Sequence, residues 1–358
     1  MTIPVAPQGV KSPEGHGRYA AAEGAGVDRM HQGAQQGLQP AMRALALDAL
    51  AKGAGATLAK NTTWRDELGI SAGTIQRALD VLAERGALRT ISRGHLGRRI
   101  ESVDAGECWR SAGLEPLRVL LSPAGAVEMD VLESTLAEEL TSMGIPHTMR
   151  HLRGGAPRID SVTAGEHDLT VVSTGTLAGV RSLAGAGWRG FERRLGPGTY
   201  YAPDQLVVLR RQADVDGHVE PTRVAIDRDS FDHEALTLAE FPVEEASVEF
   251  VDVPFPDVPA YVHAGVVDAG VWHVTRSAIP PRQVGLALLA FQRPRGRAVR
   301  DDLSGAAVVG WAGRPEIRSV LDALVLDTLD GDQQQGFRDE ADREAQLSRA
   351  AASHRVQL

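Results

Sequence analysis

The sequence of 358 residues contains one cysteine, Cys108, and no run of 18 or more apolar residues. A single cysteine excludes an internal disulfide framework and is typical of proteins from a reducing compartment. The lack of a long apolar run excludes a transmembrane helix. Residues 1–39 also lack the hydrophobic core of a secretory signal. We therefore expect a cytoplasmic protein that does not associate with membranes.

Lysine is scarce, and its placement excludes one class of enzyme. The chain has 35 arginines but only three lysines, Lys11, Lys52 and Lys60, and all three precede residue 61. A pyridoxal-phosphate enzyme forms its Schiff base on a lysine. Residues 61–358 therefore cannot form such an enzyme.

Other catalytic patterns are missing too. The sequence has no Gly-x-Ser-x-Gly elbow and no Walker A motif. His147 and His151 are four residues apart, but they fall in a predicted strand without an HExxH context. Residues 227–230 begin like a calcium loop, yet Phe231 occupies its fifth position and no loop glycine follows. We predict no catalytic residue, no metal and no cofactor, and we expect that the protein is not an enzyme.

The charge is distributed unevenly along the chain. The formal net charge is -9, but residues 40–100 contain ten Lys and Arg against five Asp and Glu, a balance of +5. Residues 1–39 balance to zero, so residues 101–358 carry -14. A basic unit that precedes a larger acidic one is typical of a nucleic-acid-binding segment joined to a sensor domain.

Residues 64–100 read as a short helix, a turn, a second helix and a hairpin with a glycine at its tip. The apolar residues of the second helix recur at i, i+3, i+4 and i+7, namely Ile75, Ala78, Leu79 and Leu82. This spacing predicts a helix with one buried face. Ser71 suits the N-cap of this helix, and Gly86 suits a C′ residue with positive φ.

The elements around this helix complete the pattern. Residues 40–52 predict a first helix, and Thr63 could cap the next one with Asp66 at N3. After Gly86, two short strands flank a turn at 93–95. This order is typical of a winged helix-turn-helix, which places its second helix in the major groove of double-stranded DNA.

The polar residues of this unit are the predicted DNA contacts: Thr63, Ser71, Gly73, Thr74, Gln76, Arg77, Arg93, Gly94 and His95. Gln76 can bond bidentately to an adenine edge, and Arg77 can reach guanine or phosphate. Thr74 has a plain structural alternative as a capping residue of the same helix.

The same residues resemble a known family. The unit resembles the GntR-type winged helix, and two runs resemble the YhfZ family within it: Ser71, Gly73, Thr74, Gln76, Ala78 and Leu79, then residues 92–97. GntR-type proteins usually carry Arg where this chain has Ala72 and Gln76. The resemblance covers about sixty residues. It implies a C-terminal half similar to type 2 periplasmic binding proteins.

Residues 115–330 show alternating strand and helix patterns in their own right. A helix is predicted over 127–143, and strands are predicted at 117–121, 147–152, 168–173, 205–209, 224–226, 248–253, 268–273 and 285–291. This alternation favours open α/β sheets. We expect an α+β multidomain protein with a two-lobed α/β clamshell, a crossover near 205–209 and a return near 285–291.

Ligands of such sheets bind at the carboxyl ends of strands, beside helix N-termini. The residues predicted there are Ser122, Arg153, Ser173, Thr174, Asp227 and Ser230. Arg153 follows the second strand, and its planar fork suits a carboxylate or phosphate. The serines and the threonine have the alternative role of helix caps.

These predictions together divide the chain into five parts: a disordered tail (1–39), a winged helix-turn-helix (40–101), a linker (102–114), a two-lobed ligand-binding domain (115–330), and a polar C-terminal helix or tail (331–358). The expected protein is a homodimeric transcription regulator that binds a small anionic effector. A binding receptor or a clamshell enzyme with a vestigial helix-turn-helix is the alternative.

Overall fold

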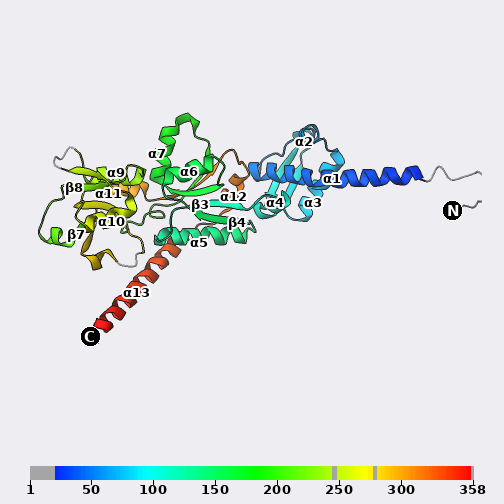
Figure 1. The fold of residues 1–358 in the computed structure, drawn as a ribbon. Helices are drawn as coiled ribbons and strands as arrows, with labels where there is room; N and C mark the ends of the chain where they lie inside the picture. The colour runs from blue at the N-terminus through cyan, green and yellow to red at the C-terminus, as the bar shows by residue number, and fades with distance from the viewer. Residues whose placement is uncertain (1–20, 244–247, 277–279, 356–358) are drawn as a thin grey trace, which may run out of the picture.

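The computed structural model describes residues 21–243, 248–276 and 280–355. Three parts follow one another along the molecule: an N-terminal unit (residues 21–103), lobe 1 (residues 104–200 and 304–328) and lobe 2 (residues 201–303), as Figure 1 shows. Helix α13 (Leu329–Arg355) packs its first turns against lobe 1 and then projects away from the body.

The N-terminal unit contains helices and one hairpin: α1 (Ala21–Lys52), α2 (Asn61–Leu68), α3 (Ala72–Glu84), β1 (Leu88–Ser92), the 3₁₀ turn η1 (Gly94–Leu96) and β2 (Arg98–Val103). The four apolar residues at helical spacing are all buried in α3, as predicted. The predicted Ser71 cap is also confirmed, because its side chain accepts from the N–H of Thr74. Gly86 ends this region with φ 73°, again as predicted. Strands β1 and β2 pair antiparallel.

Two local predictions in the N-terminal unit are wrong. Residues 21–39 form the first half of α1 and not a disordered tail, whereas residues 1–20 of that tail lie outside the described residues. Alanine and glutamine support a helix despite the many glycines around them. Helix α2 begins at Asn61 with Lys60 as its N-cap, so Thr63 lies inside its first turn and does not cap it.

The predicted linker is a packed helix. Asp104 caps α4 (Ala105–Ser111) by accepting from the N–H of Glu107, and Trp109 is fully buried. Cys108 is fully buried beside it, and burial raises the pKa of its thiol to about 12. This helix joins the N-terminal unit to lobe 1 as a packed element and not as a flexible connection.

Lobe 1 is built on the sheet β4-β3-β5-β12-β6. Its remaining elements are β3 (Leu117–Leu121), α5 (Val127–Ser142), β4 (His147–His151), α6 (Gly155–Thr163), β5 (Leu169–Ser173), α7 (Thr174–Ala184), η2 (Gly185–Gly187), β6 (Gly190–Arg194), β12 (Ala306–Trp311) and α12 (Ile317–Ala323). Strands β6 and β12 are the two that the sequence analysis missed.

Lobe 2 is built on the sheet β11-β7-β10-β8-β9. Its elements are β7 (Leu206–Arg211), α8 (Gln212–Asp216), β8 (Arg223–Ile226), α9 (Phe231–Glu240), β9 (Glu249–Asp252), η3 (Phe255–Asp257), α10 (Val258–His263), β10 (Ala269–His273), η4 (Pro281–Val284), β11 (Leu286–Leu289) and α11 (Pro294–Leu303). The chain enters this lobe before β7, as predicted. The predicted return at 285–291 is wrong, because β11 is an edge strand of lobe 2 and the chain returns only at β12.

The two sheets have the same arrangement of strand directions. In lobe 1, β3 is parallel to β4 and β5, whereas β12 is antiparallel to β5 and β6. In lobe 2, β8 is parallel to β9 and β10, whereas β7 is antiparallel to β10 and β11. The structure is therefore a two-lobed α/β protein preceded by a smaller helical unit with a hairpin.

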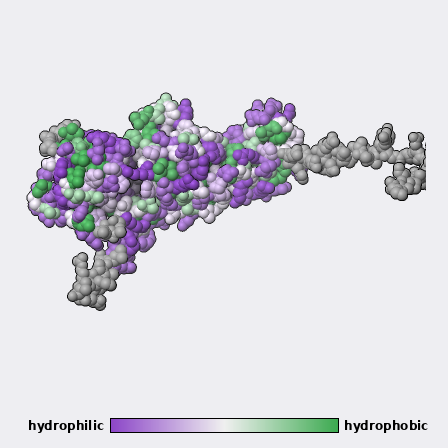
Figure 2. Space-filling model, viewed as in Figure 1, coloured by the Kyte–Doolittle hydropathy of each residue, from purple (hydrophilic) through white to green (hydrophobic). Residues whose placement is uncertain are grey.

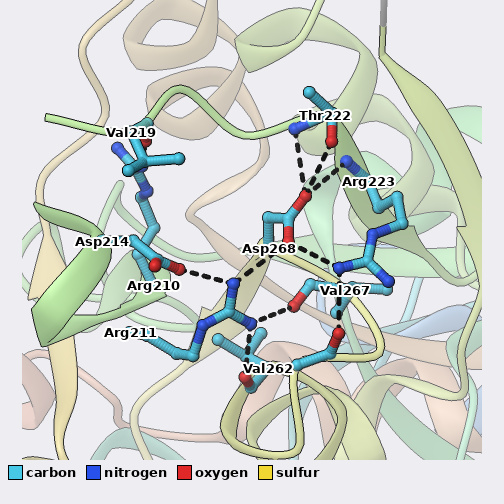
Figure 3. Close-up of polar contacts among 10 residues, drawn as sticks. Arg210, Arg211, Asp214, Val219, Thr222, Arg223, Val262, Val267 and Asp268 are labelled. Carbon is cyan, nitrogen blue, oxygen red and sulfur yellow. Dashed lines mark hydrogen bonds and ion pairs between the residues drawn. The ribbon is translucent and has the colours of Figure 1, made fainter. Parts of the chain in front are cut away.

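An aspartate before one central strand of each lobe receives bonds from an arginine on the parallel neighbour. Asp268 accepts from the backbone N–H of Arg223 at 3.0 Å, from its guanidinium at 2.9 Å, and from Arg211 at 3.1 Å (Figure 3). Asp168 accepts in the same way from the backbone and the guanidinium of Arg118. These contacts pin the parallel strand pairs at their amino ends and lower the pKa of both aspartates.

One hydrophobic cluster runs through the N-terminal unit and lobe 1. It contains Leu45 and Leu50 of α1, Trp109 of α4, and Val320 and Leu321 of α12. The hydroxyl of Ser319 also donates to the carbonyl of Leu50 at 2.5 Å. Lobe 2 has its own clusters. The N-terminal unit and lobe 1 therefore form one packed body, and lobe 2 packs against it separately.

The surface of the described residues is mixed in polarity. Figure 2 shows apolar residues over the α7 end of lobe 1, where Leu183 is 78% exposed. Within the described residues, no helix is both long enough and apolar enough to cross a membrane.

Candidate functional site

The exposed face of α3 carries three of the nine predicted DNA contacts. Gly73, Gln76 and Arg77 are exposed there, and Thr74 is half-buried with its hydroxyl 2.9 Å from that of Ser71. Thr74 thus has the capping role that was its alternative. Arg93, Gly94 and His95 lie at the tip of the hairpin and are exposed. The structure brings these residues to one end of the N-terminal unit.

The side chain of Gln76 is held at both ends. Arg98 of β2 donates to its amide oxygen at 2.6 Å, and its amide nitrogen donates to Asp80 at 2.8 Å. In contrast, the guanidinium groups of Arg77 and Arg93 have no partner among the described residues. Two exposed cations without a partner suit phosphate contacts. Arg98 was not among the predicted contacts, although it follows the hairpin tip in sequence.

A cleft of about 1140 Å³ lies between the lobes. It is lined by the ends of β8, β9 and β10 and by the segments that follow β3, β4, β8 and β9. Four of the six predicted ligand residues line it: Ser122, Arg153, Asp227 and Ser230. Ser230 also caps α9, because its hydroxyl accepts from the N–H of His233 at 3.3 Å. The oxygen of Ser122 is buried and has no hydrogen-bond partner among the described residues.

The other two predicted residues do not line the cleft. Ser173 is fully buried and caps α7 through the N–H of Thr176, while its hydroxyl donates to Asp232 at 2.6 Å. The hydroxyl of Thr174 donates to the carbonyl of Asp302. Both residues stand at a strand end as expected, but β5 is central and α9 covers its end.

An ion pair joins the lobes across the cleft. Arg153 of lobe 1 donates to Asp227 of lobe 2 at 2.6 Å. The Arg153 side chain is half-exposed, whereas that of Asp227 is buried and also accepts from the N–H of Phe255 at 2.8 Å. Asp227 in turn donates its own N–H to Nδ1 of His233 at 2.9 Å. Because Nδ1 accepts this bond, the ring proton lies on Nε2, which donates to the carbonyl of Val271 at 3.0 Å. Desolvation also lowers the pKa of this histidine.

The floor of the cleft contains residues that the sequence analysis missed. Arg158 of α6 is 2% exposed, and it donates to the carbonyls of Val171 and Leu152 and to the hydroxyl of Tyr200. Asp232 of α9 is 5% exposed and accepts from Ser173 and from Tyr201.

Both acidic groups of this floor titrate abnormally. Burial raises the pKa of the Asp232 carboxyl, and hydrogen bonds, chiefly from Ser173 and Tyr201, together with the charge of Arg158, oppose this shift only in part. Burial likewise raises the pKa of the Tyr201 hydroxyl, with the charge of Asp232 as a second cause. No sequence motif marks Arg158, Asp232 or Tyr201. Only tertiary packing brings together α6, α9 and the segment that crosses between the lobes, from which these residues come.

The sequence similarity covers this two-lobed part of the chain. The family model of the YhfZ C-terminal domain matches residues 104–340. The chain belongs to the YhfZ family. No curated relative matches it. The match begins at the N-cap of α4 and ends within α13, so the YhfZ family model includes the first turns of that helix.

Solved structures show similarity over the same part. YhfZ from Shigella flexneri is 22% identical, covers 66% of this chain and 96% of its own, and has a TM-score of 0.48. The periplasmic aliphatic sulphonate binding protein SsuA from Escherichia coli is 18% identical, with 66% and 79% covered and a TM-score of 0.43. SsuA from Xanthomonas axonopodis pv. citri, bound to MOPS, is 15% identical, with 63% and 79% covered and a TM-score of 0.43. At these values the similarities say nothing of function.

Proposed function

We propose that this YhfZ-family protein is a DNA-binding transcription regulator of the cytoplasm, and not an enzyme. Its N-terminal unit is a GntR-like winged helix-turn-helix, and the cleft between the lobes binds a small effector with an anionic group. Helix α3 lies in the major groove, and the hairpin tip contacts the backbone beside it.

One observation carries the proposal: the exposed, capped helix α3 belongs to the same packed body as one wall of the cleft. A ligand that draws lobe 2 toward lobe 1 therefore acts on the body that holds α3. The charge distribution supports the DNA partner, since residues 40–100 are basic and the rest of the chain is not. The free guanidinium groups of Arg77 and Arg93 support it further.

The DNA half is tested by selecting binding sites from random duplexes with the full chain and by measuring affinity against salt. Arg77→Ala and Arg93→Ala should each weaken binding and flatten the salt slope by about one unit, because each removes a phosphate contact. Arg338→Ala on α13 is the matched control and should leave the slope unchanged. Binding whose affinity does not depend on salt, or a selection that enriches no DNA sequence, would contradict the proposal. Either result would favour a receptor or an enzyme with a vestigial helix-turn-helix.

The effector half is tested by linkage. A ligand that changes DNA affinity must have its own affinity changed by DNA by the same factor, typically worth about 1–3 kcal/mol. Arg153→Ala removes the ion pair between the lobes and should abolish this coupling while DNA binding by the free protein persists. A normal ligand response in this variant would contradict a coupling that runs through this ion pair.

A further inference from the structure

The two walls of the cleft differ in charge. Among the described residues that line it, lobe 1 contributes two arginines, Arg153 and Arg158, and no carboxylate. Lobe 2 contributes four aspartates and two arginines: Asp227, Asp229, Asp232, Asp252, Arg228 and Arg276. A ligand that touches both walls therefore meets a cationic surface on one side and an anionic surface on the other.

Apart from Asp229, the charges at the mouth are paired within the protein. Arg153 contacts Asp227 at 2.6 Å, and Arg228 contacts Asp252 at 3.2 Å. Arg276 binds Asp130 and also Glu340 of α13. Each of these paired side chains already has an opposite charge within the protein and does not need one from a ligand.

The two buried charges of the floor, Arg158 and Asp232, interact electrostatically, but within the described residues they form no direct ion pair. The Arg158 guanidinium donates to two carbonyls and one phenol, and within the described residues it forms no ion pair with a carboxylate. One oxygen of Asp232, Oδ1, is buried and has no hydrogen-bond partner among the described residues. The rings of Tyr200 and Tyr201, which bond to Arg158 and Asp232 respectively, lie edge to face at 4.7 Å.

Charge balance then selects the ligand. A buried charge that forms no direct ion pair is costly, and a ligand gains affinity where it supplies that direct partner. A simple anion would satisfy Arg158 but would face the carboxyl of Asp232. A simple cation would satisfy Asp232 but would face Arg158.

We propose that the cleft binds a small zwitterion of the amino-acid type, with its carboxylate toward Arg158 and its ammonium toward Asp232. This inference rests on the proposed role of the cleft and adds a cationic group to the anionic one. The segment Gly154–Gly155, which lines the cleft at the start of α6, supplies backbone N–H groups on the carboxylate side.

The experiment uses the full chain without DNA. Calorimetry and thermal shift are measured with the twenty α-amino acids and with ω-amino acids from β-alanine to 6-aminohexanoate. The strongest binder is then compared with its analogue that lacks the amine and its analogue that lacks the carboxylate. We expect each analogue to bind at least about tenfold more weakly, since losing one partner of a buried charge pair has an effect of that order or more.

Two matched variants localise the effect. Asp232→Asn keeps the acceptor for Ser173 and Tyr201 and should weaken the zwitterion at least about tenfold, with no loss in the analogue that lacks the amine. Asp204→Asn makes the same change at an exposed position of lobe 2 that does not line the cleft, and should leave affinity unchanged. Arg158→Lys should weaken the zwitterion and the carboxylate analogue together.

Three outcomes overturn the proposal: no member of the panel binds at millimolar concentration, the analogue without the amine binds as well as its parent, or the two Asp variants behave alike. The second outcome would leave an anion-binding effector site intact. Because DNA is absent, a failure of the DNA-binding proposal does not affect any of these measurements.

Discussion

The amide of Gln76 is oriented by the protein itself. Arg98 donates to its oxygen, so its nitrogen points toward Asp80. A side chain held in one orientation presents a defined pattern of donor and acceptor, which base recognition requires. Within the proposed DNA complex, Arg98 is therefore a positioning residue for Gln76.

Substitution at these two positions should give different changes in specificity. Gln76→Ala should change the preferred base at one position at a cost of about 1–3 kcal/mol, because a bidentate contact is lost. Arg98→Ala should broaden the preference at that same position, since the amide is free to turn. Selection from randomised duplexes checks both, with Glu84→Gln at the far end of α3 as the control. If Arg98→Ala sharpens or moves the preference to another position, the positioning role is wrong.

Helix α4 joins the N-terminal unit to lobe 1. Trp109 is fully buried and donates through its indole N–H to the carbonyl of Glu115. It belongs to the cluster that spans the N-terminal unit and lobe 1. The two parts should therefore gain and lose structure together.

Trp109→Ala should destabilise the protein by about 3–5 kcal/mol through the cavity it leaves. Hydrogen exchange should show loss of protection in both α3 and β3 but much less in lobe 2. Trp272→Ala is the matched change in lobe 2, where the residue is 5% exposed, and should affect that lobe first. Full protection of α3 in Trp109→Ala would mean that the N-terminal unit folds independently.

The aspartate that pins β8 to β10 should control the acid stability of lobe 2. Hydrogen bonds from Arg223, Arg211 and Thr222 hold the pKa of Asp268 well below its usual range. A depressed carboxyl pKa contributes stability that is present above the unfolded pKa of 3.8 and is lost as the pH falls toward the folded value.

Asp268→Asn should therefore lower the free energy of unfolding of lobe 2 at neutral pH, by about 1.5–3 kcal/mol for each charge-assisted bond that fails to re-form. It should also flatten the loss of stability below pH 3.8. Urea unfolding at several pH values measures both effects. The variant Thr222→Val removes one hydroxyl bond and should have a smaller effect. An unchanged acid slope in Asp268→Asn would contradict this assignment.

One winged helix-turn-helix contacts too little DNA to select a site in a genome, and a two-fold dimer doubles the contacts. We expect a homodimer formed mainly through residues 101–358, with half-sites about one helical turn apart. Light scattering on the full chain at concentrations that saturate its selected duplex checks this. A monomer on a single half-site would contradict it.

The sequence alone predicted those helices and strands that are marked by nearby residues, such as apolar spacing and capping residues. The apolar spacing of α3, its Ser71 cap and the positive φ of Gly86 all depend on neighbours a few residues away. The strands that end at Leu121, Ser173 and Ile226 were also predictable, because they are short apolar runs closed by polar residues. The same logic placed Ser122, Arg153, Asp227 and Ser230 on the cleft.

Only the tertiary structure decided which of these elements share a core and which charges meet. The N-terminal unit packs against lobe 1 through residues of α1, α4 and α12. Those of α1 and α12 are far apart in sequence, as with Leu50 and Ser319, so no local stretch of sequence contains the contact. The pairing of Arg153 with Asp227, 74 residues away, and the separate burial of Arg158 and Asp232 arise in the same way. Burial and pairing depend on what lies across the cleft, and that is a property of the folded chain.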